Sequence, residues 1–518
     1  MKRYIMTIVA GMLMLPMAAQ DTYESAKLAE NDLNGTARYV GMGGAMEALG
    51  ADISTISTNP AGIGLFRRSS ANLSMGFVSQ QDAPDFGYGK KTYMSFDQVG
   101  FVLAMQTNPT NYFNFGFNYH KSKNFDYILG AADGLVKASQ NKVTYAKAIA
   151  EENKNLLYEV NADGSPNFGN SKLSCNQLDD IYARNLNYDA RDNIWYFEDA
   201  TGYTMDRSHT GYIGEYDFNI SGNINNRVYL GMTLGLHDVH YKHYSEYVER
   251  FAENSPITVA DDRKVTGAGF DLKFGIIFRP IAESPLRVGL SIATPTWYDL
   301  TTSNYTTVTD DGGSAYASEE YDFNMTMPWK FGLSLGHTIG NNLAIGASYE
   351  YTDYGSMDNR VKHDNRNWDT YDSESDDVMN RHTEQSLRAV NTLKLGVEYK
   401  PVPEMAVRLG YNWVSPMYKK DAFRDGSLQS LGSYYSSTTD FTNWQSTNRI
   451  TCGFGYQCDK NLNLALAYQY QTRNGEFEPF MSYYCNIPGY EDDWSNIVDP
   501  VKVNFKRHQV LLTATYSF

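Results

Sequence analysis

Three histidines at a spacing of three residues are the first group that could do chemistry. They are His237, His240 and His243, and imidazole nitrogens commonly bind transition metals and haem iron. The neighbouring residues alternate as in a β-strand, where a spacing of three places side chains on opposite faces. A shared metal or haem site would need a bend in that strand, and we predict that the protein holds neither a metal nor another cofactor.

Two acidic clusters are the next candidates for a cation site. They consist of Asp364, Asp369, Asp372, Glu374, Asp376 and Asp377, and of Glu491, Asp492 and Asp493. Neither cluster has the twelve-residue spacing of a calcium loop. We interpret both as solvated loops, with divalent bridging to lipopolysaccharide as the alternative.

A glycine run, Gly41-Met42-Gly43-Gly44, is similar to the start of a phosphate-binding loop. The third glycine of G-x-G-x-x-G would fall at Met46, and the flanking strand and helix are missing from the sequence pattern. Close packing of backbone against backbone explains these glycines better. No nucleophile motif, carboxylate pair or zinc signature stands out, so we predict that the protein is not an enzyme.

The four cysteines give little evidence of chemistry. Cys452 and Cys458 fall on one predicted strand about 20 Å apart, which is too far for a disulfide. Cys175 and Cys485 fall in predicted outer loops, where they could form a disulfide or remain free thiols.

The N-terminal residues predict export. Lys2 and Arg3 precede an apolar run from Tyr4 to Leu15 and the small residues Ala18 and Ala19, which is the layout of a signal peptide over residues 1–20. No later segment is long and apolar enough for a membrane helix. The net charge of −16 argues against nucleic acid as a partner.

Strict alternation of apolar and polar residues predicts β-strands that face lipid on one side. In the last segment, Val510, Leu512, Ala514, Tyr516 and Phe518 share one face, and Gln509, Thr513 and Ser517 lie on the other. The same pattern recurs around residues 228–237, 343–351, 405–413 and 462–470. These segments suit a transmembrane β-barrel, in which a tilted strand needs about 9 to 11 residues.

Connection lengths set the predicted number of strands. Six connections are short, at residues 107–110, 225–226, 280–285, 340–342, 401–404 and 459–461. Seven are long, near residues 80–94, 122–211, 242–265, 299–324, 357–385, 417–445 and 475–503. The sequence therefore predicts an all-β fold: an antiparallel barrel of about fourteen strands over residues 70–518, with long extracellular loops. The largest loop, 122–211, is expected to carry helices over residues 131–158 and 173–186.

A barrel of this width needs something to fill its lumen. Between the signal peptide and the first strand lies an N-terminal segment, residues 21–69, that is rich in Gly, Ala, Ser and Thr. Its apolar residues from Ala45 to Ile56 recur at helical spacing, and Asn59-Pro60 should end that helix. We expect the N-terminal segment to lie inside the barrel as a small hatch.

These features together resemble the FadL/TodX family of outer-membrane transporters for long-chain fatty acids and other hydrophobic compounds. The resemblance rests on Asp52 and Asn59-Pro60-Ala61-Gly62 in the N-terminal segment, and on G-L-S-I-A-T-P-T-W-Y-D-L, M-P-W-K-F-G-L and V-R-L-G-Y-N-W-V-S-P, which begin at Gly289, Met327 and Val407. It implies passive uptake: capture in an outer groove, binding in an apolar lumen site, hatch movement, and lateral exit near a kinked third strand.

The resemblance also suggests roles for particular residues. Asn59, Pro60, Ala61 and Gly62 would form the gating turn against strand three, and Gly116 is the candidate kink. The terminal aromatics Tyr516 and Phe518 resemble the signal read by the barrel-assembly machinery of Gram-negative bacteria.

We expect a monomer in the outer membrane, in contact with lipid and lipopolysaccharide, whose ligand is a hydrophobic small molecule. A general diffusion porin for polar solutes and a surface receptor or adhesin, with haem as one ligand, are the alternatives.

Overall fold

The chain folds into one closed antiparallel barrel. The computed structural model describes residues 21–150, 155–362, 373–485 and 490–518, so the predicted signal peptide lies outside the described residues. β1 pairs with β2 on one side and with β23 on the other, and this last pairing closes the sheet. The predicted fold class is confirmed.

Fourteen strands form the barrel, and four of them are interrupted. In order they are β1 (Ser70–Gln81), β2 (Thr92–Asn108), β3 (Asn111–Asn124) with β4 (Tyr127–Ala138), β9 (Ala200–Ile224), β10 (Val228–Arg250), β11 (Ile257–Phe278), β12 (Arg287–Ala293) with β13 (Trp297–Asp310), β14 (Gly313–Thr326) with β15 (Lys330–Ile339), β16 (Leu343–Asp353) with β17 (Asp358–Lys362), β19 (Ala389–Val402), β20 (Met405–Val414), β21 (Phe441–Gln457), β22 (Leu462–Glu478) and β23 (Val501–Ser517).

The outer face of the barrel is apolar and the inner face is polar. On β23, Leu512 is 53 % exposed while its neighbour Thr513 is buried, as the alternation predicts. The same arrangement holds on β10, where Leu230, Met232, Leu234 and Leu236 are exposed. This apolar exterior is the one that an outer-membrane barrel presents to lipid. Among the described helices, none combines the length and the apolar character that crossing a bilayer requires.

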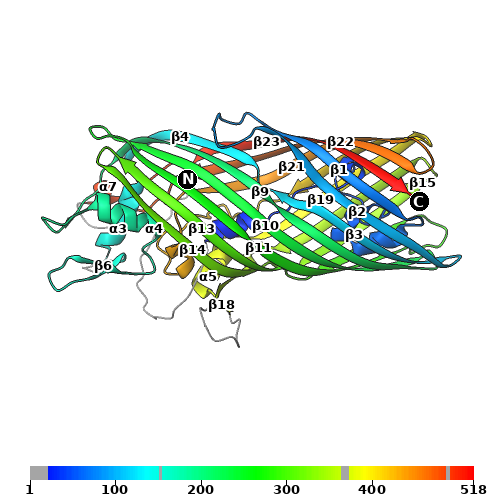
Figure 1. Cartoon of the computed structure of the whole chain (residues 1–518), viewed down its shortest axis with the longest axis horizontal. Coiled ribbons are helices and arrows are strands. Elements are labelled where there is room, and N and C mark those ends of the chain that lie inside the picture. Colours follow the sequence, from blue (N-terminus) through cyan, green and yellow to red (C-terminus); the bar gives the residue numbers. More distant parts are fainter. Residues whose placement is uncertain (1–20, 151–154, 363–372, 486–489) are drawn as a thin grey trace.

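All six predicted short connections join neighbouring strands at one end of the barrel, where the C-terminus also lies (Figure 1). The long connections at the other end are shorter than predicted. Strand three continues as β4 to Ala138 and strand four begins at Ala200, so the largest loop is 139–199 rather than 122–211. Only two residues join β13 to β14. The outer halves of these strands carry Thr, Ser, Asn and Asp instead of an apolar face, and the sequence pattern there is that of a loop.

Short helices lie at this second end (Figure 1). The largest loop holds α3 (Gln140–Ile149), α4 (Gln177–Tyr182), a π-helical turn (Ala183–Asn187) and two small hairpins, β5 (Tyr158–Val160) with β6 (Pro166–Ser171) and β7 (Tyr188–Asp189) with β8 (Ile194–Trp195). Other loops hold a 3₁₀ turn η4 (Tyr354–Ser356), β18 (Ser373–Ser375), α5 (Asp377–Ser386), α6 (Leu431–Tyr434) and α7 (Glu491–Trp494). The expected helix over 131–158 begins only at Gln140, because residues 131–138 belong to β4.

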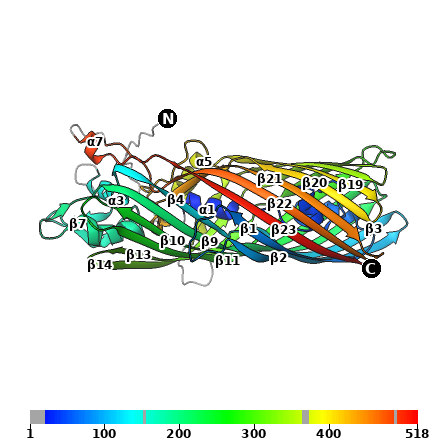
Figure 2. The same ribbon diagram turned by 90° about the horizontal axis from the view of Figure 1, so that it is seen from above.

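The N-terminal segment lies within the barrel in both views (Figures 1 and 2). It forms α1 (Thr22–Ala29), α2 (Ala37–Gly41) and two 3₁₀ helices, η1 (Ile53–Ser57) and η2 (Pro60–Leu65). The helix expected from Ala45 to Ile56 is wrong. Gly43, Gly44, Gly50 and Ala51 adopt φ between 52° and 82°, which breaks the chain into turns.

Candidate functional site

The turn Asn59-Pro60-Ala61-Gly62 begins a helix rather than ending one. The Asn59 side chain caps η2 by accepting a hydrogen bond from the Ala61 amide at 3.2 Å, and Pro60 occupies the first helical position. Asn59 is fully buried, and its Nδ2 donates to the Leu290 carbonyl at 3.5 Å.

This turn packs against strands four to seven. The Pro60 carbonyl accepts from Asn219 of β9 at 3.4 Å, and a side chain at Gly231 of β10 would overlap Pro60. Strand three is reached four residues after Asn59, where Asn114 donates to the Ile63 carbonyl at 2.7 Å. The gating role of the turn stays a prediction.

Small residues let the rest of the N-terminal segment approach the barrel. A side chain at Gly410 of β20 would overlap the Gly43 amide, and one at Gly396 of β19 would overlap the Met42 carbonyl. Thr451 then donates to the Gly41 carbonyl at 3.2 Å, and the Ala37 amide donates to Thr513 at 2.7 Å. The expectation of close backbone packing is confirmed, with glycines on both sides of the contact.

The pairing between strands two and three stops midway along the barrel. It runs from Asn108↔Asn111 to Gln98↔His120. Residues 92–97 of β2 and 121–124 of β3 are all described, and the structure contains no backbone pairs between them. We call this junction the lateral seam.

Two residues of the N-terminal segment occupy the lateral seam. The Asp32 amide donates to the Ser122 carbonyl at 2.8 Å, and its carboxylate accepts from the Asn124 amide at 3.0 Å. Asn34 Nδ2 donates both to the Lys121 carbonyl and to Asp97 Oδ1, each at 3.1 Å, and so bridges the two strands. The N-terminal segment thus supplies partners that β2 supplies elsewhere in the ladder.

A glutamine side chain closes the outer part of the same seam. β4 pairs with β9 on one edge, and on its other edge the Ile128 amide and carbonyl bond to the side chain of Gln80, both at 2.7 Å. The loop after β1 lies alongside, since Ser208 Oγ donates to the Tyr88 carbonyl at 3.2 Å.

Ion pairs hold the N-terminal segment beside the lateral seam. Glu30 contacts Lys123 of β3 and Arg473 of β22, both at 2.7 Å, and Asp32 contacts Arg507 of β23 at 3.2 Å. Burial alone would raise the pKa of Glu30, but Arg473 and Lys123 outweigh burial and lower this pKa to about 2. Burial would likewise raise the pKa of Asp32, but Arg507 and Lys123 outweigh burial and lower this pKa, so both carboxylates are charged at neutral pH.

A cavity of about 210 Å³ lies between the N-terminal segment and the inner wall, next to the seam. Aromatic side chains form part of its lining: Tyr127, Tyr241, Tyr298, Tyr418, Trp444 and Phe505. Charged side chains form another part: Lys123, Glu30, Asp32, Arg449, Arg473 and Arg507. The expected apolar lumen site is therefore wrong in one respect, because charged groups that hold the N-terminal segment also line the cavity.

The structure separates the histidines that the sequence brings together. His237 and His243 are buried on the inner face of β10, whereas His240 points outward. His243 contacts Asp261 at 2.7 Å, and His240 contacts Asp238 at 2.9 Å.

The role of Gly116 as a kink stays a prediction. Gly116 pairs regularly with Val102 and with Asn219, and the register irregularity of β3 lies between Lys121 and Lys123. The pairing between β2 and β3 stops at the lateral seam, and not at Gly116.

Two other predictions concern the loops. Cys175 is a buried free thiol and is not joined to Cys485. Asp364, Asp369 and Asp372 of the first acidic cluster lie outside the described residues, and Asp376 caps α5 by accepting from the Met379 amide at 3.0 Å.

At the C-terminus, Tyr516 and Phe518 are exposed on the outer face. The Phe518 amide donates to the Ser69 carbonyl at 2.9 Å, beyond the last pair of the β1–β23 ladder. Their role as an assembly signal stays a prediction.

Sequence reasoning missed Asp32, Asn34 and Gln80. None of them belongs to a motif, and their partners lie on strands far away in the sequence. A weak signal was available for the N-terminal pair, because Asp32 and Asn34 belong to a mainly polar run, residues 30–34, that comes just before the closely packed small residues.

Comparison with known proteins identifies the fold. No protein-family model and no curated protein matches the sequence. Among solved structures, a Pseudomonas aeruginosa FadL homologue is 13 % identical, with 94 % of this chain and 99 % of that chain covered and a TM-score of 0.50. The Ralstonia pickettii toluene transporter TbuX is 12 % identical over the same shares, with a TM-score of 0.49. The chain has the fold of the FadL-type outer-membrane barrels.

Proposed function

We propose that the protein carries hydrophobic small molecules across the outer membrane of a Gram-negative bacterium, without an energy source, and releases them sideways into the bilayer. The observation that supports this most is the lateral seam, where side chains and the N-terminal segment replace the strand-to-strand ladder. Such contacts can separate without unfolding the barrel, since each costs only about 0.5–1.5 kcal/mol net when water replaces it.

The route follows from the positions of the cavity and the seam. A ligand enters from the end that carries the helices and reaches the cavity through the lumen. Movement of Glu30 to Asn34 then uncovers the gap between β2 and β3, and the exposed apolar residues of β2 beside it, Met94 and Phe96, lead into lipid. The aqueous path stays closed because residues 36–65 pack on the inner face below.

The size of the cavity limits what it holds in this state. Pockets for drug-sized ligands typically measure about 300–1,000 Å³, so about 210 Å³ suits a compact hydrocarbon or one end of a longer chain. Long-chain fatty acids would need the N-terminal segment to shift further. The solved neighbours include a toluene transporter, which favours compact ligands in the proposal.

The alternatives differ in what crosses the barrel. A general porin needs a continuous aqueous channel, and a receptor or adhesin needs neither channel nor seam. The filled lumen disfavours the first, and the interrupted seam has no use in the second.

Uptake into proteoliposomes separates these functions. Purified protein is reconstituted, and the entry of radiolabelled toluene and oleate is compared with that of glucose, with empty liposomes as the background. We expect saturable uptake of a hydrophobic probe and no glucose entry. Glucose entry with a steady large conductance would establish a porin, and no transport of any probe would favour a receptor.

The gating turn is tested in the same assay. Replacing Asn59 and Pro60 by alanine should leave the heat-modifiable mobility of the barrel unchanged, because the strand ladder does not use them, and should change the uptake rate. Arg68→Ala is the control, because Arg68 bonds to the turn residue Asn461 outside the lumen. Equal uptake by the wild type, the double variant and Arg68→Ala would show that the turn has no part in gating.

A further inference from the structure

Six ionisable side chains form a buried cluster on the inner wall below the lateral seam. Lys273 of β11 contacts Glu215 at 2.5 Å, Asp271 at 2.9 Å and Asp217 at 3.1 Å. His120 of β3 and His237 of β10 complete the cluster, which we call the Lys273 cluster. Every member is at most 7 % exposed.

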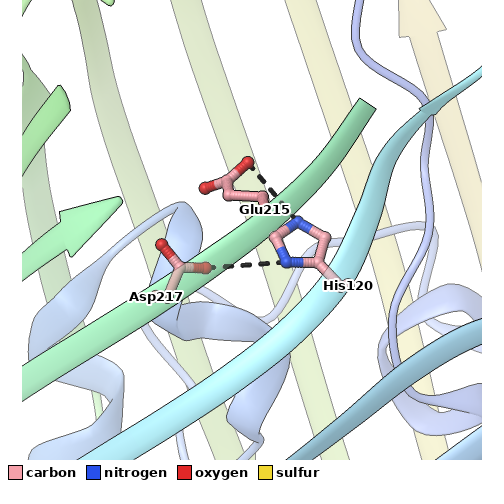
Figure 3. Close-up of side chains that lie close together, drawn as sticks. All are labelled: His120, Glu215 and Asp217. Atoms are coloured by element: carbon pink, nitrogen blue, oxygen red, sulfur yellow. Dashed lines mark ion pairs between the residues drawn. The ribbon is translucent and has the colours of Figure 1, made fainter. Parts of the chain in front are cut away.

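The two histidines lie between the carboxylates. The His120 ring has Nε2 3.7 Å from Glu215 and Nδ1 3.5 Å from Asp217, and Figure 3 shows the ring between the two. His237 has Nε2 3.1 Å from Asp271 and Nδ1 3.9 Å from Glu215. Donor atoms of His120, Glu215 and Asp217 lie within 4.8 Å of one another.

The charges of the Lys273 cluster do not balance. Three carboxylates face one ammonium, and among the described residues no further lysine or arginine is ion-paired with them. With neutral imidazoles the cluster carries a charge of −2. Because an unbalanced buried charge is costly, added protons or a bound cation must offset it.

Several atoms of the cluster that could bind a metal ion also lack a hydrogen-bond partner. They include Asp217 Oδ2, on a carboxylate that is fully buried, and His237 Nδ1. Buried polar atoms are seldom left in this state unless a water or an ion binds there.

The distances distinguish a metal ion from two extra protons. A charged imidazolium donates to a carboxylate at about 2.7–2.9 Å, which is shorter than either contact of His120. Two ligands of a tetrahedral ion with bonds of about 2.0–2.2 Å lie about 3.4 Å apart. The 3.5 Å between His120 Nδ1 and Asp217 matches this separation. Glu215 faces the other ring nitrogen at 3.7 Å, so its carboxylate would rotate toward an ion bound at Nδ1.

The barrel also leaves room for this cluster. Gly235 of β10 pairs with both Asp217 and Asp271, and a side chain there would overlap Asp271 Oδ1 and Lys273 Nζ. Glycine at this position keeps the inner face open where the charged groups meet.

We propose that the Lys273 cluster binds one divalent transition-metal ion of the Zn²⁺ type, through His120, Glu215 and Asp217. Nitrogen and carboxylate oxygen donors suit this class, and a dication brings the cluster to neutrality. Asp271 and Lys273 orient the ligands. Since His120 forms the last pair before the ladder stops, the ion fixes β3 to β9 at the inner limit of the lateral seam.

Metal binding to the full mature protein tests this proposal. The detergent-solubilised barrel is stripped with a chelator, dialysed against ZnCl₂ and analysed by elemental mass spectrometry. We expect one tightly bound Zn²⁺ per chain, and affinity at least about tenfold lower in His120→Gln and Asp217→Asn. His240→Gln, on the outer face of β10, is the matched control and should bind like the wild type.

Two results would overturn the proposal: wild-type protein that retains no Zn²⁺, or binding that persists in the His120 and Asp217 variants. X-ray absorption at the zinc edge of the wild type covers the case in which those variants fail to fold. It should show imidazole nitrogen and oxygen at about 2.0–2.2 Å, and sulfur at about 2.3 Å would instead place the ion on a cysteine and contradict the site.

Discussion

Two seams of the same barrel are built in different ways. At the closing seam, β1 and β23 pair over twelve consecutive residues, from Ser70↔Ser517 to Gln81↔Lys506. At the lateral seam, the ladder between β2 and β3 stops at Gln98↔His120, and Asp32, Asn34 and Gln80 supply the missing partners. Backbone hydrogen bonds hold the closing seam. Side chains and the N-terminal segment, which can move away, hold the lateral seam.

This difference in construction assigns stability to the paired junctions and opening to the lateral seam. Backbone pairs in a lipid-facing wall break at high cost because lipid offers no replacement partners. The partners at the lateral seam are two residues of the N-terminal segment in the lumen and the side chain of Gln80 on β1, and water can replace them without breaking a backbone pair. A barrel can therefore open there while its other junctions hold.

The largest effect is expected from removing the part of the N-terminal segment that fills the lumen. Deleting residues 36–64 should leave the closing seam intact and convert the protein into a channel for small polar solutes, because side chains do not fill a barrel wider than about eight strands. Planar-bilayer conductance measures this. A deleted protein that assembles yet conducts no better than the intact one would place the segment outside the permeation path.

The closing seam should fail when its last residue is changed. Phe518→Asp places a charge on the lipid face beside the final pair, and we expect severalfold less heat-modifiable barrel in the outer membrane. Asn341→Asp, in a short turn, serves as the charge-matched control, since it also adds one negative charge. Undiminished folded barrel in the Phe518 variant would show that this residue does not guide assembly.

Acid should loosen the lateral seam before the closing seam. Glu30 has its pKa lowered from 4.5 to about 2, so its ion pairs stabilise the docked segment above pH 4.5, and this stabilisation is lost as the pH falls toward 2. The full shift corresponds to about 3 kcal/mol, less any screening by water in the lumen. The protection factor of the Asp32 amide, its exchange rate relative to an unfolded peptide at the same pH, should fall over this range in the wild type and be low at neutral pH in Glu30→Gln. A protection factor that does not change with pH would contradict the role of these ion pairs.

Gln80→Ala should have the smallest effect. It leaves the Ile128 amide and carbonyl without partners, at a cost of about 1–3 kcal/mol, and should raise the exchange rate of the Ile128 amide by about tenfold or more. Gln81→Ala, at the neighbouring position in the paired closing seam, is the matched control. Equal exchange in both variants would mean that the Gln80 contacts do not hold the seam.

The sequence predicted those strands in which apolar and polar residues alternate. Alternation on β10, β16, β20, β22 and β23 and the six short turns were enough for the strand number and for placing the short connections at one end of the barrel. The outer ends of β13 and β14 were not predicted, because Thr, Ser and Asn on both faces leave no period of two. The helix expected from Ala45 to Ile56 failed because positive φ at Gly50 and Ala51 overrides spacing.

The site was less predictable than the fold. Asp32 contacts Arg507, and His120 contacts Glu215, because the barrel brings distant parts of the chain together. No short sequence motif predicts such contacts. Gly116 was chosen because glycine weakens a strand, yet β2 and β9 both pair with it.

A reversible cross-link at the lateral seam tests the account most directly. Residues 32 and 122 hydrogen-bond through their backbones at 2.8 Å, so Asp32→Cys with Ser122→Cys should form a disulfide that holds the N-terminal segment in place. Asn72→Cys with Thr515→Cys, which pair directly in the closing seam with side-chain oxygens 2.7 Å apart, is the control. We predict that oxidation stops uptake of a hydrophobic probe only in the 32–122 pair and that a reductant restores it. Unchanged uptake through the oxidised 32–122 protein would contradict lateral release at this seam.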